Sequence, residues 1–508
     1  MTEQLPFSIF RVMGEAYLLI GSELKIPLVN GQNGQLQISQ LEEEKLANAL
    51  GDQALAEVLK YLQTEEVQKQ LSPQAEAQRI LESQDPLQEV KKHLDNFIVG
   101  EDANKQLLFI LLQSGKADRK LKQIILIGGP SGAGKSNLAS LAKSFRCYEV
   151  GRLTEHALDY LDLSEYEILY LKELGFMDRE GNNRDLATVK FLSTDDMGYR
   201  IVYVTRDEKG RLTTEEKVVP PITLLSTTTR ITIDSQFERR GWVLNPDESE
   251  EQTKRILAFK AKLKQQENEV ILGLRQMTDA DWSRQVIAQV ANLIEYHPVI
   301  IPFPESMVAL LSVKNLRVRG DIDKLYALVT LTSLVYQKRL PKIGDAIIAM
   351  PWVLERALSI AYEPVVTMTM QLDKRTRTLL QLMKEFKVSP ETAITATIRA
   401  AWATRLNVSE RTIRNYLDEM ADKGFCRTER PARDERIDYL LYPVEEIEAG
   451  QSSLMLENLV GNRKFPTSNR KNLVDETKRR LSSLVGKNDF VGEGLFDLLD
   501  LWVREDLS

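Results

Sequence analysis

The chain has 508 residues, of which 43% are hydrophobic and 28% charged; this is typical of soluble globular proteins, and the length predicts about three or four domains. Its formal net charge of -7 argues against a polybasic nucleic-acid binder, so any contact with DNA must come from local patches. The two cysteines, Cys147 and Cys426, and the three histidines are scattered. This excludes a disulfide framework and makes a zinc site unexpected.

Membrane and export signals are not evident in the sequence. The longest apolar stretches, such as Ile124–Ile127 and Pro298–Pro304, fall far short of the roughly 20 residues that a helix needs to cross a bilayer. The first ten residues lack the basic start and apolar core of a secretion signal. We therefore expect a cytoplasmic protein that does not contact a membrane.

The first part of the chain, residues 1–85, predicts a small α+β domain followed by a linker. Short apolar runs alternate around a turn at Asn30–Gly34, and residues Glu42–Gln63 have a helical pattern. Residues 66–86 are rich in Gln, Glu, Ser and Pro, which is typical of a linker or an exposed helix. Nothing in this region indicates its role.

The chemistry begins at a glycine-rich loop between a predicted buried strand, Gln123–Ile127, and a predicted helix, Ser136–Lys143. The loop matches G-x-x-x-x-G-K-[ST], in which backbone N–H groups hold phosphates, the lysine reaches the β- and γ-phosphates and the serine hydroxyl ligates Mg²⁺. The pattern predicts an ATP and Mg²⁺ site. Its residues are Gly129, Pro130, Ser131, Gly132, Ala133, Gly134, Lys135, Ser136 and Asn137.

Hydrolysis also needs a carboxylate on a neighbouring strand to polarise the attacking water. Glu173, after the apolar run Ile168–Leu171, is the best candidate. The residue before it, where an aspartate near the metal is usual, is Lys172. Mg²⁺ would then depend on Ser136, phosphates and water, or on another acid such as Asp178, and hydrolysis could be weak or partner-dependent. The alternative is that Glu173 is a solvated carboxylate at a strand end.

At this point the order of parts resembles AAA+ ATPases, and among them the minichromosome maintenance (MCM) and viral superfamily-three helicases, over about residues 90–340. The segment Phe97–Lys105 is similar to the one that precedes the loop in MCM proteins. The resemblance implies an α/β P-loop core over residues 86–245, with a parallel sheet, and a helical lid over residues 246–365. It also implies that Glu173 is the glutamate that activates water.

An insertion at residues 198–219 predicts a β-hairpin, because β-favouring arms flank a turn at Asp207–Gly210. Its position resembles that of the pre-sensor hairpin of MCM-type helicases. In that family the hairpin projects into the channel of a hexamer and grips DNA, which implies that Lys209 and Arg211 contact phosphates. The alternative is an ordinary solvated hairpin.

The strand Ile222–Thr229 resembles the sensor-1 strand, which implies that Thr227 or Thr228 holds the attacking water, although asparagine is usual there. The segment Asp234–Arg240 resembles the one that supplies an arginine finger to a neighbouring subunit.

In that segment Gln236 stands at the usual arginine position, so Arg239 or Arg240 would take over the role. The alternative is a surface arginine paired with Glu238. Further on, Asn245–Glu248 resembles the entry to the lid. Arg319 resembles the sensor-2 arginine that faces nucleotide, with Arg317 as the fallback.

Residues 371–445 predict a helix-turn-helix with a two-stranded wing over Gly424–Arg430 and Arg436–Tyr442. Ser409 is a suitable N-cap for the second helix, whose apolar face carries Ile413, Leu417 and Met420. Off that face lie the candidate DNA-binding residues Arg411, Thr412, Arg414 and Asn415. The pattern resembles winged-helix domains, which follow the AAA+ core in MCM proteins and can instead bind protein.

Residues 446–508 predict a basic tail, with cations concentrated between Arg463 and Arg480, and a terminal helix at Phe490–Val503. The tail could add phosphate contacts or be a solvated run of charge. The terminal helix could bind a protein partner or fold back on the chain's own core.

Taken together, these features predict a ring-forming, hexameric AAA+ ATPase that couples hydrolysis to translocation on DNA or unwinding of DNA, in the replication of a prokaryotic or mobile element. The alternative is an ATP-gated DNA-binding switch for defence, transposition or partition, with slow hydrolysis and no helicase activity. Lys172 and Gln236 favour this alternative. A metabolic kinase would have no use for the hairpin or the winged helix.

Overall fold

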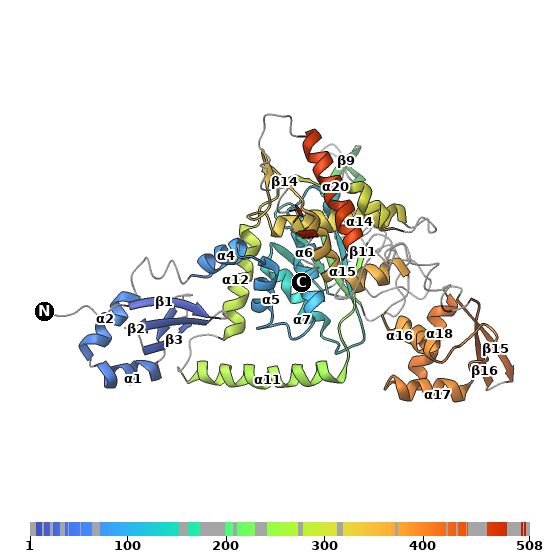
Figure 1. Ribbon diagram of the computed structural model, residues 1–508, viewed down its shortest axis with the longest axis horizontal. Helices are drawn as coiled ribbons and strands as arrows, with labels where there is room; N and C mark the ends of the chain where they lie inside the picture. Colours follow the sequence, from blue (N-terminus) through green and yellow to red (C-terminus); the bar gives the residue numbers. More distant parts are fainter. Residues whose placement is uncertain are drawn as a thin grey trace.

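The computed structural model describes most of the chain and shows three parts, with the N-terminal strands and a C-terminal unit, residues 374–444, on opposite sides of a central body (Figure 1). The described residues are 7–12, 15–20, 24–30, 36–38, 40–50, 52–62, 72–151, 161–172, 199–206, 211–228, 241–272, 278–311, 318–370, 374–422, 425–432, 435–442, 444, 465–484, 499–500 and 502–503. None of the helices within these ranges is long and apolar enough to span a membrane.

The N-terminal part is an antiparallel meander of four strands followed by two helices. The strands are β1 (Phe7–Val12), β2 (Glu15–Ile20), β3 (Leu24–Asn30) and β4 (Leu36–Ile38), and the helices are α1 (Gln40–Leu50) and α2 (Asp52–Leu62). Alternate strand residues such as Leu18 and Ile26 are buried, together with Val58 of α2. The single helix expected over Glu42–Gln63 is instead two helices, and Gly51, a weak helix former, stands between them in the sequence.

The central body is built on a five-stranded parallel sheet with the order β11-β5-β10-β7-β6. Its strands are β5 (Ile124–Gly128), β6 (Cys147–Val150), β7 (Ile168–Leu171), β10 (Thr223–Thr228) and β11 (Gly241–Leu244). Every residue of β5, β7 and β10 is buried, as expected for a parallel sheet covered on both faces. The fold class is therefore α/β, as the sequence predicted.

The strand order places a switch point at the carboxyl end of β5. From β5 the chain passes to the far edge strand, β6, whereas the last strand, β11, lies on the other side of β5. In open α/β sheets, ligands bind in the crevice that such a reversal leaves at the carboxyl ends of the strands.

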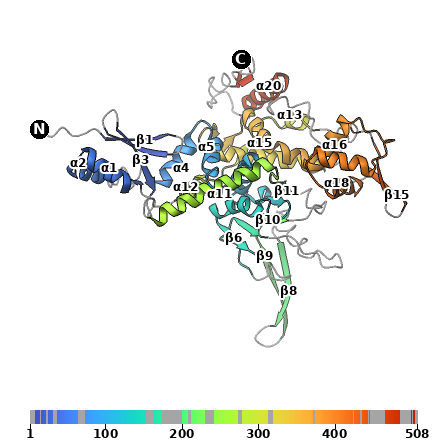
Figure 2. The same cartoon turned by 90° about the horizontal axis from the view of Figure 1, so that it is seen from below.

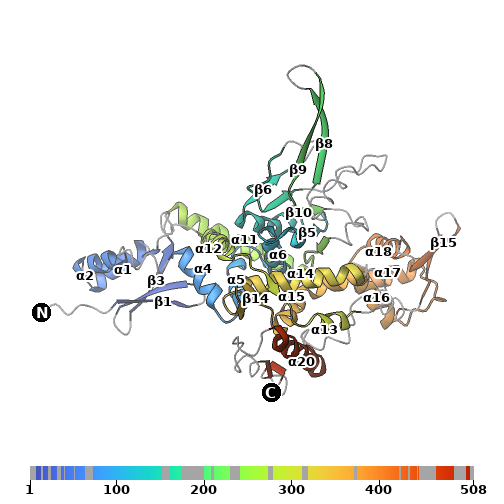
Figure 3. The same ribbon diagram turned by 90° about the horizontal axis from the view of Figure 1, so that it is seen from above.

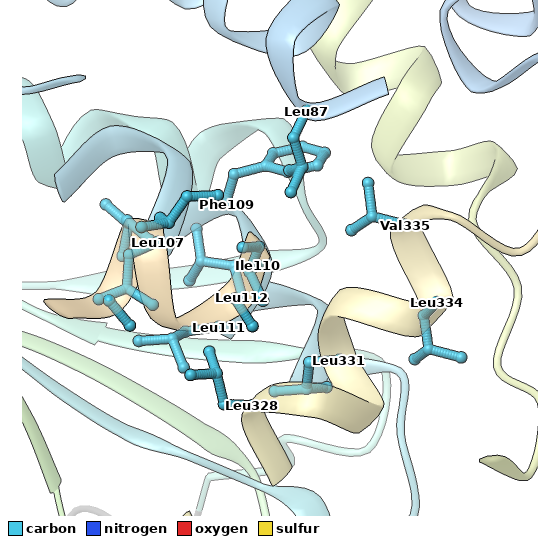
Figure 4. Packing of buried hydrophobic residues seen from close by; sticks show 14 of the residues in the cluster. Leu87, Leu107, Phe109, Ile110, Leu111, Leu112, Leu328, Leu331, Leu334 and Val335 are labelled. Carbon is cyan, nitrogen blue, oxygen red and sulfur yellow. The ribbon is translucent and has the colours of Figure 1, made fainter. Parts of the chain in front are cut away.

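One face of the sheet is covered by helices that come before the glycine-rich loop in the sequence and by helices that come after it. They are α4 (Pro73–Glu82), α5 (Pro86–Leu94), α6 (Asp102–Leu112), α12 (Asp279–Leu293), α14 (Val318–Val335) and α15 (Pro351–Met370). Leu107 and Phe109 of α6 lie in one apolar cluster with Leu328 and Val335 of α14 (Figure 4). The segment expected to form the lid thus shares its core with the sheet.

One long helix, one short helix and a small three-stranded sheet also belong to the body. These are the long helix α11 (Glu250–Ile271), the short helix α13 (Pro304–Ala309) and a small sheet of β12 (Val299–Ile300), β13 (Lys342–Ile343) and β14 (Ala346–Ile348). α11 runs along the lower edge of the molecule in Figure 1 and crosses in front of the body when seen from below (Figure 2).

A two-stranded hairpin projects from the body (Figure 3). Its strands β8 (Tyr199–Arg206) and β9 (Leu212–Val219) pair antiparallel, from Tyr199 opposite Val219 to Arg206 opposite Leu212. Val219 is buried with Leu126 and Leu224 on the second face of the sheet, which fixes the base of the hairpin.

The C-terminal unit has an apolar core of its own. Its elements are α16 (Lys374–Glu385), α17 (Ala396–Arg405), α18 (Glu410–Asp422), β15 (Cys426–Ala432) and β16 (Glu435–Leu440). A bridge from Ile394 to Asp438 adds a third short strand position to the β15–β16 pair.

Beyond strand β16 the chain returns to the central body as helix α20 (Thr467–Leu484), which packs on α13 and α15. Leu473 and Val474 belong to the apolar cluster of the body. Arg470, from the stretch expected to be a basic tail, is buried against Glu355 of α15. This part of the chain is thus a docked helix.

Candidate nucleotide-binding site

The glycine-rich loop lies at the carboxyl end of β5, at the switch point of the sheet. Gly132 and Gly134 have φ values of 87° and 82°, a left-handed conformation that favours glycine. The N–H group of Gly129 donates a 3.2 Å hydrogen bond to the carbonyl oxygen of Thr228, which ties the loop to the end of β10. Successive N–H groups in such a loop form a concave site for anions.

The helix after the loop is shorter than the sequence predicted. α7 spans Lys135–Ala139, and the chain then tightens into a 3₁₀ segment, η3 (Ser140–Ser144). Leu138 and Ala139 are buried and anchor the helix in the core, whereas Ser136 and Asn137 are exposed toward the loop side.

The ammonium group of Lys135 folds over the loop. Its Nζ atom donates hydrogen bonds of 2.7 Å to the carbonyl oxygen of Gly129 and 2.6 Å to that of Pro130. Phosphate oxygens are stronger acceptors for an ammonium group than carbonyl oxygens, because they carry charge. The loop therefore holds the Lys135 cation and the Ser136 hydroxyl in a short span, a set that fits a polyphosphate with a bound divalent cation.

A cavity of about 310 Å³ lies beside the loop, within the size range of small-molecule sites. Three chain segments enclose it: the segment before α6, the loop with the start of α7, and the inner side of α11 with two residues of α12. The lining residues are Phe97, Ile98, Val99, Glu101, Gly132, Ala133, Gly134, Asn137, Leu138, Gln252, Ile256, Phe259, Lys260, Leu263, Ala280 and Arg284. The apolar wall suits a planar base next to a phosphate cradle.

Sequence reasoning found the loop and the segment Phe97–Lys105 but missed the α11 wall. Gln252, Ile256, Phe259 and Leu263 recur at intervals of three and four residues, which is the one signal that could have revealed the inner face of this mostly exposed helix. Arg284 was also missed; its guanidinium lies over the ring of Phe97, 5.0 Å from the centroid.

The segment before α6 that lines the cavity is bound by Lys105, whose side chain is fully buried. Its Nζ atom donates hydrogen bonds to the carbonyl oxygens of Ile98 (3.2 Å) and Gly100 (2.6 Å). It also pairs with Asp95 and, at 3.1 Å, with Asp102. A buried ammonium with four oxygen partners fixes the path of the segment that lines the cavity.

The same segment is joined to the entry of α11 by a polar network around Glu101. The Glu101 carboxylate accepts hydrogen bonds from the Asn104 side chain (2.6 Å) and from the N–H of Asp247 (2.6 Å). Asn104 also donates to the carbonyl oxygen of Asn245 at 2.9 Å. The two sides of the cavity are thus held together at its base.

At the carboxyl ends of β7 and β10, hydroxyl groups join the two strands. Ser226 donates to the carbonyl oxygen of Leu171 at 2.8 Å, and Thr227 donates to that of Lys172. The hydroxyl of Thr227 is thus bonded to the end of β7. Thr228 is the residue beside the loop, because its carbonyl oxygen accepts the hydrogen bond from Gly129. Both are buried.

Lys172 points toward the edge strand rather than toward the loop. Its Nζ atom lies 2.8 Å from the Glu149 carboxylate of β6, which also pairs with Lys143 at 3.1 Å. The hydrogen bond from Lys172 lowers the pKa of Glu149. The position that usually carries a metal-side aspartate thus holds a cation engaged with another strand.

Several predicted catalytic residues lie outside the described residues: Glu173, Arg239, Arg240 and, at the tip of the hairpin, Lys209. Asp178, Gln236 and Arg317 also lie outside them. Arg319 is described; it begins α14 with an exposed side chain and is not among the residues that line the cavity. Arg211 is exposed at the start of β9.

In the C-terminal unit, α18 has the amphipathic arrangement that the sequence predicted. Ile413, Leu417 and Met420 are buried, and the N–H of Thr412 donates to the Ser409 hydroxyl at 3.1 Å. The side chains offered for DNA contact lie outward.

Among these outward side chains, Arg411 and Arg414 are exposed, whereas Thr412 and Asn415 are half-buried. Arg414 is paired with Glu410 at 2.9 Å. The DNA-binding role of the four residues remains a prediction.

A scan of family models and a search of curated proteins both give no match to this chain. Among solved structures, a candidate ATPase from Cytophaga hutchinsonii is 10% identical, with a TM-score of 0.32, over 58% of this chain and 89% of that one. A full-length MCM homolog from Methanopyrus kandleri is 11% identical, with a TM-score of 0.35, over 57% and 61%. The inhibitor-bound JCV helicase is 10% identical, with a TM-score of 0.25, over 50% and 71%. At these TM-scores the similarities support no conclusion about function, which is therefore argued from the residues of this chain.

Proposed function

We propose that this chain is an AAA+ ATPase that binds ATP with Mg²⁺ at the loop Gly129–Ser136. The observation that carries the proposal is the position of this loop: it follows β5, an inner strand of a parallel sheet, at the switch point of that sheet and beside a cavity with an apolar wall. The base of the nucleotide would lie against Phe97, Ile256 and Phe259, and the phosphates in the loop.

In this proposal the chain's own groups divide the chemistry as follows. Lys135 would leave the carbonyl oxygens of Gly129 and Pro130 to bind the β- and γ-phosphates, and Ser136 would hold Mg²⁺, which would neutralise developing charge. Glu173 orients the attacking water, with Thr228 beside it. These roles for Glu173 and Thr228 come from the family resemblance.

A neighbouring subunit would complete each site. Arg239 or Arg240 would reach the γ-phosphate across the interface, where a guanidinium stabilises transition-state charge. Arg319 would act from α14 once nucleotide is bound. The assembly proposed is a homo-hexameric ring, with a protein partner as a further possibility for the C-terminal segment.

The function we propose for this ATPase is translocation on DNA or unwinding of DNA in the replication of a prokaryotic or mobile element, in the cytoplasm. The hairpin β8–β9 projects from the body (Figure 3), and Lys209 and Arg211, which belong to the hairpin in sequence, would contact a strand in a ring's channel. The winged helix would add contacts through Arg411, Thr412, Arg414 and Asn415.

The second candidate is an ATP-gated DNA-binding switch, and one observation favours it. Lys172 stands where a carboxylate near the metal is usual, and its ammonium is engaged with Glu149. A site without that carboxylate would hydrolyse ATP slowly, and the bound nucleotide would then govern assembly instead of movement.

The test measures the ATPase rate of the purified protein alone, with single-stranded DNA and with forked DNA, next to Lys135→Ala. Strong stimulation by DNA that Lys135→Ala abolishes supports the motor. Tight ATP binding with negligible turnover that DNA does not change would overturn the motor and support the switch. Failure of a fluorescent ATP analogue to bind at all would overturn both.

A further inference from the structure

The helix α11 has two different sides. Its inner side supplies Gln252, Ile256, Phe259 and Leu263 to the cavity, and its remaining surface is exposed over most of its 22 residues. Nothing lies below it in Figure 1, so this outer surface faces away from the body. Apart from Lys260, which also lines the cavity, the residues on it have no part in the proposed nucleotide site.

The exposed part of α11 is strongly basic at its centre. Between Glu251 and Glu267 the sequence contains five cations and no acidic residue: Lys254, Arg255, Lys260, Lys262 and Lys264. The whole chain has a net charge of -7, so this is a local concentration against the overall balance.

Most of these cations are not neutralised within the protein. Lys254 pairs with Glu250 at 2.7 Å and Lys264 with Glu267 at 2.9 Å, both within the helix. For Arg255, Lys260 and Lys262, the part of the chain that the structure describes supplies no ion-pair partner. Cations that a fold leaves unpaired on an exposed helix are available to an external anion.

The arrangement of the cations indicates the shape of that anion. At about 100° per residue, Arg255 and Lys262 lie on one flank of α11, and Lys260 and Lys264 lie on the other. Between the flanks, on the side away from the cavity, lie the small residues Ala258 and Ala261 together with the larger Lys254, Leu257 and Gln265.

A helix with its side chains is about 10–12 Å across. The major groove of B-DNA is about 12 Å wide, and a phosphate backbone runs along each rim. Two basic flanks on either side of one helix match two parallel rows of phosphates better than a single point anion.

We propose that the outer face of α11, through Arg255 and Lys262 on one flank and Lys260 and Lys264 on the other, binds the phosphate backbones of duplex DNA. The contact is independent of base sequence, because phosphates position a protein without reading bases. This inference rests on the proposed function only in naming DNA, and no other polyanion, as the ligand. It adds a third contact surface, and it places DNA on the helix whose other side closes the nucleotide cavity.

The test uses the full-length protein and a fluorescein-labelled 25-base-pair duplex, with binding followed by anisotropy over a series of salt concentrations. The variant is Arg255→Glu with Lys262→Glu, which avoids the cavity-lining Lys260. The matched control is Lys338→Glu with Lys471→Glu, which makes the same change in charge at two other exposed lysines. Binding of a fluorescent ATP analogue shows that each variant retains the cavity.

We expect the α11 variant to lose at least tenfold in duplex affinity, and its slope of log affinity against log salt to become shallower by about 2, since each lost phosphate contact removes about 1. The control should stay within about twofold of wild type, because exposed charges more than about 10 Å away are screened. Equal losses in both variants, or no duplex binding by the wild type, would overturn the proposal.

Two further arms separate this inference from the proposed function. If Lys209→Ala with Arg211→Ala, and Arg411→Ala with Arg414→Ala, leave duplex binding intact while the α11 variant loses it, the hairpin and winged-helix contacts fail and the α11 contact stands. If the wild type binds phosphatidylserine vesicles through Arg255 and Lys262 but does not bind the duplex, the ligand is a membrane surface and the proposal is overturned.

Discussion

The side chain of Gln252 joins the two walls of the nucleotide cavity: its Nε2 atom donates a 2.6 Å hydrogen bond to the carbonyl oxygen of Val99. Its Oε1 atom is buried without a hydrogen-bond partner in the described structure, and it lies where a side chain on Gly100 would have to be, 2.2 Å from an ideal Cβ. Gly100 has a φ of 62°. The contact between Gln252 and the segment at Val99 therefore requires glycine at position 100, because any larger residue would collide with the Gln252 amide.

The first prediction tests this contact. Gly100→Ala should lower affinity for an ATP analogue at least tenfold, because a left-handed residue with a Cβ costs roughly 1–2 kcal/mol and the new methyl group collides with Gln252. Adding Gln252→Ala removes the collision but not the backbone cost. In a double-mutant cycle the two changes should couple by about 1 kcal/mol or more. Simple additivity of the two losses would contradict the role of this contact.

A second prediction concerns Lys172. Lys172→Asp should raise the rate of ATP hydrolysis several-fold, because it places a carboxylate where the family resemblance expects one beside the metal. Lys172→Ala is the control, since it breaks the ion pair with Glu149 without adding a carboxylate. The steady-state rate at saturating ATP is compared for the three proteins. Equal rates for the Asp and Ala variants would show that this position does not serve the metal.

A third prediction follows from Lys122, whose ammonium is largely buried and donates a 2.5 Å hydrogen bond to the carbonyl oxygen of Gly115. Burial lowers the pKa of Lys122 to about 8. Between that value and the ordinary lysine pKa of about 10.4, the unfolded chain holds a proton that the folded chain has released, so this group makes the protein more stable as pH rises.

Lys122→Met should therefore remove a rise in unfolding free energy of about 1–3 kcal/mol between pH 8 and pH 10. At pH 7 the variant gains stability by removing a buried charge, but it loses the hydrogen bond to Gly115, and the two effects partly cancel. The diagnostic quantity is therefore the slope of unfolding free energy against pH. It is measured by denaturant unfolding as the difference between variant and wild type. Parallel pH profiles for the two proteins would show that Lys122 titrates normally.

A fourth prediction tests the docking of α20. Arg470 forms two hydrogen bonds with the carboxylate of Glu355 through one nitrogen, at 2.9 and 3.0 Å, and lies 4.9 Å from the ring centroid of Trp502. Arg470→Ala should destabilise the docked segment by about 3–5 kcal/mol, because it leaves a mostly buried carboxylate unpaired. Limited proteolysis should then cut within residues 465–484.

The control for this prediction lies on the same helix. Arg479 is 68% exposed and pairs with Glu305 at 2.9 Å on the surface, so Arg479→Ala should change stability by no more than about 1 kcal/mol. Glu355→Ala combined with Arg470→Ala should recover part of the loss, since it removes the orphaned charge. Equal protease resistance of wild type and Arg470→Ala would contradict a clamping role for this pair.

Local patterns in the sequence were enough for several elements of this protein. The buried strand before Gly129, the hairpin arms on either side of Asp207–Gly210 and the apolar face Ile413, Leu417 and Met420 each depend on residues close together in the chain. Such signals survive in a single sequence because propensity and periodicity act over a few residues. The boundaries were less exact: the helix after the loop ends at Ala139, not Lys143, as its last turn tightens.

The tertiary structure alone decided which distant residues meet. The sequence determined the phosphate loop, but only folding brings Ile256 and Phe259 across from Phe97 to close a cavity, turns Lys172 toward Glu149 on the next strand, and buries Arg470 against Glu355. Each of these contacts joins residues more than 20 positions apart, so no local period records it. Their partners are set by the strand order and by the packing of helices on one shared core, which follow from burying apolar surface over the whole chain.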